Sequence, residues 1–239
     1  MKYVVFIPSR YGSSRLQGKP LIDLCGLPMV IRTYHQCIKV VDPDKVYILT
    51  DDNRIKKVSD KYNAQCIMSS KNCRTGTDRI AEAAEKIDAD IYINVQGDEP
   101  IFNPYDLLKI ILEATRHPDY VINGYCKIND KKMFHNYNIP KVIINNENFL
   151  LYMSRAGIPA NKHKVFKTAF RQVCLYAFPK NKLIKFKNYE KKGVIESIED
   201  IEILRFIEMG EKVYMIPMSE QSISVDTKKD IKKVRRALR

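Results

Sequence analysis

Short apolar runs alternate with amphipathic stretches along the first half of the chain. The runs are rich in β-branched residues and close at proline or polar turns, which predicts buried strands over Tyr3–Pro8, Val46–Thr50, Gln65–Met68 and Ile91–Val95. Apolar residues at helical spacing predict helices over 28–40, 77–87 and 105–115, and one more after Asp51 and Asp52. Strands that alternate with such helices indicate an α/β fold, a mostly parallel sheet flanked by helices.

The second half of the chain has a different pattern. Two apolar segments, 141–144 and 149–153, flank the polar run 145–148, which predicts a β-hairpin. Strands are predicted over 171–178 and 212–217, and helices over 197–209 and 230–238, with Gly210 ending the first of these helices. We see no linker-like stretch, so we expect a single domain, 1–239, built from the halves 1–125 and 126–239.

Composition places the chain among folded proteins. A hydrophobic content of 45% in 239 residues is enough for a substantial core. The first residues lack the pattern of a secretion signal, and no apolar run approaches 18 residues, so we expect a cytoplasmic protein without a membrane partner. The six cysteines lack CxxC spacing, and we interpret them as structural thiols.

The chain is strongly basic, with a formal net charge of +13. Such a charge is compatible with nucleic acid, an anionic membrane surface or small anionic substrates. No aromatic RNA-binding motif, helix-turn-helix pattern or zinc finger accompanies the basic residues, so we expect no nucleic-acid partner and favour a lysine-rich solvated surface. A protein that binds nucleic acid or another polyanion remains the alternative.

Polar loops follow the predicted strands at 9–19, 51–52, 69–79 and 96–99. Because ligands of parallel α/β sheets bind outside the carboxyl ends of the strands, these loops should meet at one edge. The first loop carries Arg10, Arg15 and Lys19 beside Gly18, which suits phosphate better than a basic loop without a ligand. It matches neither the Walker A loop nor the GxGxxG motif.

Two aspartates far apart in the chain are candidates for a metal site. Asp98 follows the strand Ile91–Val95, and Asp226 lies in a turn before the last predicted helix. Either one alone could cap a helix. Together they suit Mg²⁺, which takes one or two carboxylates and substrate phosphates. No histidine is placed to act as a general base, so we expect metal-assisted removal of a proton.

Seven motifs occur in the order found in one enzyme family. In these motifs the chain resembles the 3-deoxy-manno-octulosonate cytidylyltransferases (CMP-KDO synthetases): 7–20, 75–79, 94–100, 141–142, 154–159, 199–205 and 225–227. The resemblance implies a Rossmann-like nucleotidyltransferase fold and a homodimer. It also implies transfer of CMP from CTP to the anomeric hydroxyl of a KDO-type sugar acid, with release of pyrophosphate, for lipopolysaccharide or capsule synthesis.

The resemblance further implies roles for single residues, with 1–125 binding CTP and 126–239 serving the acceptor and the dimer. The catalytic group would be Arg10, Arg15, Lys19, Asp98 and Asp226, with the two aspartates holding Mg²⁺. The CTP site would comprise Pro8, Ser9, Arg10, Arg15, Lys19, Arg74, Thr75, Gly76, Asp78, Arg79, Gln96 and Gly97. The acceptor site would comprise Arg155, Gln172, Tyr176, Glu199 and Glu202.

One stretch departs from the family pattern. Gln172 stands where the family usually has histidine, and Cys174 where it usually has glycine. Both changes fall on the acceptor side, whereas the nucleotide motifs are nearly intact. The residues therefore favour CTP chemistry over any one acceptor, and 8-amino-KDO or another ulosonic acid stays open beside KDO.

Overall fold

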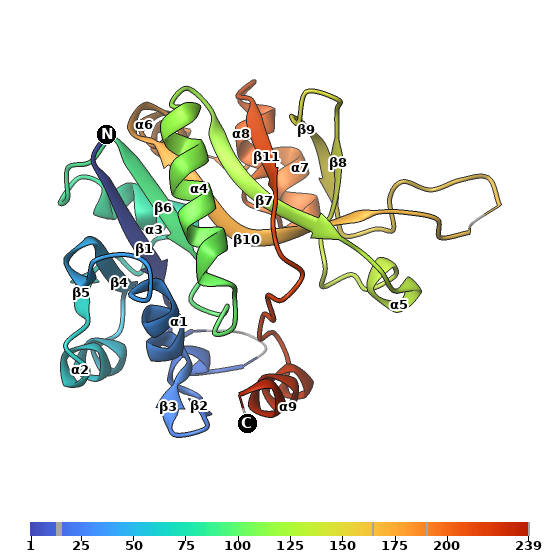
Figure 1. Ribbon diagram of the computed structural model, residues 1–239. Helices are drawn as coiled ribbons and strands as arrows, with labels where there is room; N and C mark the ends of the chain where they lie inside the picture. The colour runs from blue at the N-terminus through green and yellow to red at the C-terminus, as the bar shows by residue number, and fades with distance from the viewer. Residues whose placement is uncertain (13–15, 164, 190, 239) are drawn as a thin grey trace.

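A twisted sheet forms the centre of the protein, whose computed structural model describes residues 1–12, 16–163, 165–189 and 191–238. Seven strands of the described residues run in the order β11-β7-β10-β6-β1-β4-β5 (Figure 1). All neighbouring pairs are parallel except those of β10, which is antiparallel to β6 and β7. The expected mostly parallel sheet is confirmed. The strands are β1 (Tyr3–Pro8), β4 (Val46–Thr50), β5 (Gln65–Met68), β6 (Ile91–Val95), β7 (Val121–Lys127), β10 (Phe170–Pro179) and β11 (Val213–Pro217).

Helices cover both faces of this sheet. Alternate residues of β6 enter two different cores, Ile91 and Ile93 on one face and Tyr92 on the other, as the two-residue period of a strand requires. The first core receives α1 (Met29–Cys37), α2 (Asn53–Lys61) and α4 (Pro104–Arg116), and the second receives α3 (Gly76–Ala83), α6 (Lys180–Asn188) and α8 (Leu204–Glu208). Among the described residues, no helix is both long and apolar enough to cross a bilayer.

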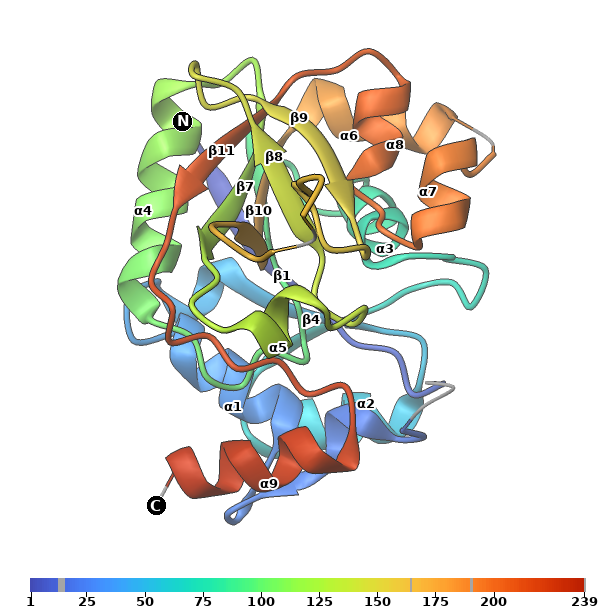
Figure 2. The ribbon, with the colours of Figure 1, turned by 90° about the vertical axis from the view of Figure 1, so that its right-hand side faces the viewer.

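Two smaller units flank the sheet at opposite ends of the molecule (Figure 2). The predicted hairpin is present as β8 (Lys141–Ile144) and β9 (Leu150–Ser154), and β8 also pairs with β10. The short helix α5 (Lys131–Phe134) precedes it. At the other end, α9 (Lys228–Ala237) packs through Val234 on Leu24 and Met29, beside the small ribbon of β2 (Asp23–Leu24) and β3 (Leu27–Pro28).

The predicted helix over 197–209 is wrong. The chain forms α7 (Val194–Glu199) and α8 instead, separated by Asp200 in the left-handed region at φ 50°. Arg155 donates hydrogen bonds to the carbonyl oxygens of Glu199 and Asp200, at 2.6 and 2.8 Å, which a continuous helix would use for its own N–H groups. A tertiary contact therefore overrides the helical pattern. The predicted helix over 77–87 is also shorter and ends at Ala83.

Candidate active site

A cleft of about 1250 Å³ opens at the carboxyl ends of β1 and β6 and extends toward the hairpin. It brings together most of the residues singled out in the sequence. Asp78 and Glu199 do not line it, and Arg15 lies outside the described residues. Those that line it are Pro8, Ser9, Arg10, Lys19, Arg74, Thr75, Gly76, Arg79, Gln96, Gly97, Asp98, Arg155, Gln172, Tyr176, Glu202 and Asp226.

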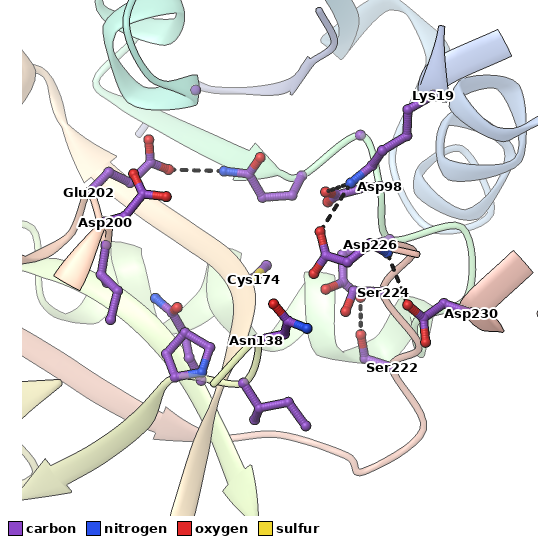
Figure 3. A pocket seen from close by; sticks show the side chains of 18 of the residues that line it. Lys19, Asp98, Asn138, Cys174, Asp200, Glu202, Ser222, Ser224, Asp226 and Asp230 are labelled. Atoms are coloured by element: carbon purple, nitrogen blue, oxygen red, sulfur yellow. Dashed lines mark hydrogen bonds and ion pairs between the residues drawn. The ribbon is translucent and has the colours of Figure 1, made fainter. Parts of the chain in front are cut away.

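Lys19 lies between the two aspartates (Figure 3). Its Nζ is 2.5 Å from Oδ2 of Asp98 and 3.4 Å from Oδ1 of Asp226. Burial is the largest influence on the pKa of Lys19 and lowers it, but the two carboxylates together raise this pKa above its ordinary value. Lys19 therefore stays charged, and the carboxylates converge on one cationic centre.

The segment that carries Asp226 is fastened to the loop that carries Asp98. The N–H of Ile223 donates to the carbonyl of Ile101 at 2.9 Å. The hydroxyl of Ser222 donates to Oε2 of Glu99. Burial, followed by the charge of Asp98, raises the pKa of Glu99 to about 7. These contacts bring residues from distant parts of the sequence to one wall of the cleft.

Gly97 allows the β1 and β6 loops to approach each other. A Cβ at this position would lie 2.4 Å from Oγ of Ser9 and 2.8 Å from the carbonyl oxygen of Pro8. The second of these atoms belongs to the backbone and cannot swing away. The absence of a side chain at residue 97 thus sets the distance between the loop that follows β1 and the loop that carries Asp98.

The loop before α3 is built on a capping box. Oγ1 of Thr75 accepts from the N–H of Asp78 at 3.1 Å, and Oδ2 of Asp78 accepts from the N–H of Thr75 at 2.8 Å. Oδ1 of Asp78 accepts from Nη1 of Arg205 at 2.9 Å. Both oxygens of Asp78 are thus engaged within the fold, so this carboxylate shapes the loop instead of facing the cleft.

The cationic side chains of the cleft differ in their exposure to solvent. Arg79 is buried, donating to Ser69 and to Oδ2 of Asp51, the latter at 3.3 Å. Arg10 and Arg74 line the cleft with exposed side chains. The exposed pair is able to contact an anion in the cleft, whereas Arg79 fixes the position of α3 against β4.

On the far side of the cleft, Glu202 connects two loops. Its Oε1 accepts from Nε2 of Gln96 at 2.9 Å, and its Oε2 accepts from the N–H of Thr77 at 3.0 Å. Burial is the largest influence on the pKa of Glu202 and raises it. Gln96 is thereby held against Glu202 in the wall of the cleft.

Glu199 has a structural role outside the cleft. Its carboxylate accepts from the hydroxyls of Ser154 and Tyr152, at 2.6 and 3.2 Å, and from the N–H of Arg155 at 2.8 Å. The resemblance implied a contact between Glu199 and the acceptor. The structure instead places Glu199 where it anchors α7 to β9 and fixes Arg155, which does line the cleft.

Gln172 is oriented by a buried asparagine. Nδ2 of Asn123 donates to the carbonyls of Val173 and Leu175, at 3.0 and 2.9 Å, next to an irregularity in the pairing of β7 and β10. Only Oδ1 of Asn123 is then left to accept, and it accepts from Nε2 of Gln172 at 3.0 Å. The amide of Gln172 therefore has a defined direction.

Several cleft residues were not anticipated from the sequence. They lie on α5, on the loop before β8, on β10, on either side of α7, and between β11 and the first turn of α9, in positions that depend on long-range packing. Lys228 and Lys229 could have been found, because they follow Asp226 closely in the sequence. The main additions are Lys132, Asn136, Asn138, Arg171, Cys174, Lys192, Asp200, Glu220, Ser224, Lys228 and Lys229.

Asp98 and Asp226 form a donor set that fits a divalent cation. Asp98 and Asp226 both reach one ammonium nitrogen, and their side chains keep 30% and 23% exposure, so both can accept a further ligand. No cluster of three or more His, Cys, Asp or Glu occurs within the described ranges. Two carboxylates fit Mg²⁺, which completes its coordination with phosphate oxygens and water, better than zinc, which in structural sites takes four protein ligands.

Comparison of the sequence with known families gives the class to which this protein belongs. The profile of the family described as cytidylyltransferase matches residues 4–213. The chain belongs to this cytidylyltransferase family, and it is an enzyme of that class.

Within the family the similarity is to a narrower group. The chain is 36% identical to a 3-deoxy-manno-octulosonate cytidylyltransferase of Chlorobium phaeobacteroides, covering 100% of this chain and 98% of the relative. It is 34% identical to an 8-amino-3,8-dideoxy-manno-octulosonate cytidylyltransferase of Shewanella frigidimarina, covering 98% and 97%. The solved CTP complex of CMP:2-keto-3-deoxy-manno-octonic acid synthetase is 31% identical, with a TM-score of 0.92 over 100% of this chain and 98% of the other.

Proposed function

We propose that the protein transfers CMP from CTP to the anomeric hydroxyl of a 3-deoxy-octulosonate (KDO-type) sugar acid and releases pyrophosphate. The observation that carries this proposal is the convergence of Lys19, Asp98 and Asp226 at one end of a cleft that also holds the exposed side chains of Arg10 and Arg74. Full-length similarity to enzymes named for this reaction supports the choice of substrates.

The reaction joins two anions, so the first requirement is to reduce their repulsion. The sugar hydroxyl oxygen forms a bond to the α-phosphorus of CTP while the bond to the bridging β-phosphate oxygen breaks, and the hydroxyl proton is lost. Arg10, Arg15 and Lys19 are proposed to contact the triphosphate and to stabilise the charge on its oxygens. Pro8, Ser9, Arg74, Thr75, Gly76, Gln96 and Gly97 would shape the surrounding CTP site.

Mg²⁺ is the proposed cofactor, held by Asp98 and Asp226. A bound Mg²⁺ would neutralise phosphate charge and lower the pKa of a nearby hydroxyl. Lys19 contacts both carboxylates and would hold them close together. This arrangement needs no histidine base, in agreement with the interpretation of the sequence.

The acceptor is proposed to lie between Arg155, Gln172, Tyr176 and Glu202. KDO is the first candidate, because the Chlorobium relative is named for it. An 8-amino-KDO acceptor is the second, because the Shewanella relative is named for that sugar and is similar over the same length. The amide of Gln172 suits a neutral hydrogen-bonding group of either sugar.

A homodimer is proposed for the assembled enzyme. The segment between β9 and β10 extends away from the body of the protein (Figure 1). Exposed apolar side chains occur on this segment and on the hairpin and the loop before it. Their exposed fractions are 54% for Val165, 56% for Leu151 and 71% for Tyr137. A second copy would cover such a surface. We further propose that the enzyme acts in the cytoplasm, where CTP is made, in lipopolysaccharide or capsule synthesis.

The basic surface gives limited support to a polyanion-binding function. The lysines of α6 are each paired with a carboxylate: Lys180 with Asp88, Lys182 and Lys185 with Glu211, and Lys187 with Glu85. Part of the basic cluster in the sequence is therefore used within the fold. Binding of DNA or RNA that weakens steeply with salt and survives Arg10→Ala would identify such a second function.

The proposed reaction is tested by pyrophosphate release from CTP and Mg²⁺ across a panel of KDO, 8-amino-KDO and other ulosonic acids, with mass spectrometry of the product. Formation of a CMP-sugar from KDO supports the first assignment. Turnover of 8-amino-KDO alone would replace KDO and keep the reaction class. Absence of turnover with every acid would refute the proposed function.

A further inference from the structure

Lys141 is a buried lysine that the proposed reaction does not use. It opens β8, its side chain is fully buried, and it does not line the cleft. Its Nζ donates to the carbonyl of Asn136 at 3.0 Å, to that of Ile139 at 2.7 Å, and to that of Arg155. An ammonium group has three protons, and here each one has a backbone acceptor.

The three acceptors belong to two segments of the cleft wall. Asn136 and Ile139 lie in the loop between α5 and β8, and Arg155 follows β9 directly. Asn136, Asn138, Ile139, Pro140 and Arg155 all line the cleft. The N–H of Gln172 donates to the carbonyl of Pro140 at 3.1 Å, which connects the same loop to β10. Lys141 thus lies at the junction of every segment proposed to surround the acceptor on this side.

The environment of Lys141 is costly for a cation. Across the described part of the chain, it forms no ion pair with a carboxylate. Burial and, next, the charge of Arg155 lower the pKa of Lys141 to about 8, while Glu199 opposes this shift. An apolar residue would fill the same space without the desolvation cost. The desolvation cost is explained if the ammonium group of Lys141 is needed to hold the carbonyls of Asn136, Ile139 and Arg155 together.

We propose that Lys141 is a positioning residue for the acceptor, which fastens the loop 136–140 to Arg155 and so fixes the width of the acceptor site. The proposal rests on the proposed function, because it assumes that a sugar acid occupies this part of the cleft. Lys141 does not act as a general base, since its three protons face the backbone and its side chain does not reach the cleft.

The first test compares Lys141→Met and Lys141→Gln with the wild type and with Lys182→Met. Lys182, on α6, is the matched control, because its side chain is only 15% exposed and is paired with Glu211. In steady-state assays with CTP, Mg²⁺ and the acid that the wild type accepts, Lys141→Met should raise the acceptor KM about tenfold and leave the KM for CTP within twofold. Lys141→Gln retains two hydrogen-bond donors, so its acceptor KM should lie between those of the wild type and Lys141→Met. Lys182→Met should leave both KM values unchanged.

The second test does not require turnover. Hydrogen–deuterium exchange of the amides in 136–140 should accelerate in Lys141→Gln at least fivefold, with no change in 74–79. Equal changes in both KM values, or unchanged exchange in 136–140, would overturn the proposal. Should the wild type accept no acid while exchange in 136–140 still accelerates, the proposed function fails and the role in positioning the acceptor fails with it, leaving only a structural contact. If Lys141→Met does not fold, Lys141→Gln decides both tests.

Discussion

The N–H of Val225 donates a hydrogen bond of 2.9 Å to the carbonyl oxygen of Asp98. This backbone contact joins the turn that carries Asp226 to the loop that carries Asp98, so the two carboxylates meet through main-chain geometry as well as through Lys19. Main-chain contacts survive changes of side chain. We therefore expect that either aspartate can be replaced without moving the backbone of the other, which makes the pair suitable for mutational analysis.

Replacement of either aspartate should abolish most turnover. We expect Asp98→Ala and Asp226→Ala each to lower kcat by at least about 10²-fold, because each removes a negative charge that is proposed to hold Mg²⁺ at the phosphates. Pyrophosphate release at saturating CTP and acceptor measures this effect. Asp119→Ala, at an exposed position, is the control and should be fully active. Retained turnover of the two variants at ordinary Mg²⁺ would contradict the proposed metal site.

Gly97→Ala should separate the β1 and β6 loops. The added methyl group would lie within 2.8 Å of the Pro8 carbonyl oxygen, and the backbone has to shift to accept it. We expect a loss of about 1–3 kcal/mol in the free energy of unfolding, together with a higher KM for CTP. Thermal unfolding and steady-state kinetics test both. Gly12→Ala is the matched control, since a Cβ there meets no atom within 4 Å; equal effects of the two substitutions would disprove the steric argument.

Arg205 should be important for stability and for the shape of the loop before α3, which is proposed to line the CTP site. Its guanidinium donates to both oxygens of Glu196 at 2.7 Å, donates to Asp78, and lies 3.9 Å from the ring centre of Phe186. Arg205→Met leaves Glu196 buried and unpaired, so we expect a loss of about 3–5 kcal/mol. Arg205→Lys keeps the charge but loses the bidentate geometry, and should recover only part of this loss in denaturant titrations. Full recovery would show that charge alone matters.

The pH dependence of stability should report on Lys141. Its pKa is lowered to about 8 in the folded protein, whereas an unfolded lysine titrates near 10.5. Between these pH values the unfolded chain binds more protons than the folded one, so the contribution of Lys141 to stability rises with pH. The difference in unfolding free energy between wild type and Lys141→Met should increase by up to about 3 kcal/mol from pH 7 to pH 10.5 in favour of the wild type. A difference that stays flat or falls would show that the lysine is not buried as a cation.

The sequence predicts the first half of the fold well, because its strands follow a local pattern. β1, β4 and β6 are predominantly apolar runs, and each occupies its predicted residues. β7 was missed because Asn123-Gly124 resembles a turn. In the structure Asn123 binds the backbone of β10, and a Cβ on Gly124 would lie 2.2 Å from Sδ of Met218. Both residues are selected by neighbours that no local pattern contains.

The same limit applies to the site. Lys19 and Asp98 could be grouped from the sequence because loops at the ends of parallel strands converge. Asp226 lies in a turn before the last helix and could be added only as a second carboxylate that suits Mg²⁺. The different roles of Glu199 and Glu202 could not, since they depend on which side of α7 and α8 the chain turns at Asp200. The helix α6 was missed because its lysines resemble a solvated run, whereas Leu183 and Phe186 between them are buried.

The position of β10 has a consequence for the order of folding during synthesis. This strand, residues 170–179, separates β6 from β7, and without it their facing edges expose unpaired N–H and C=O groups. A nascent chain that has left the ribosome only as far as residue 125 lacks the strand that connects β6 to β7 in the sheet. The segment 1–125 is therefore not expected to fold as an independent module, and the facing edges of β6 and β7 stay unpaired until β10 has been synthesised.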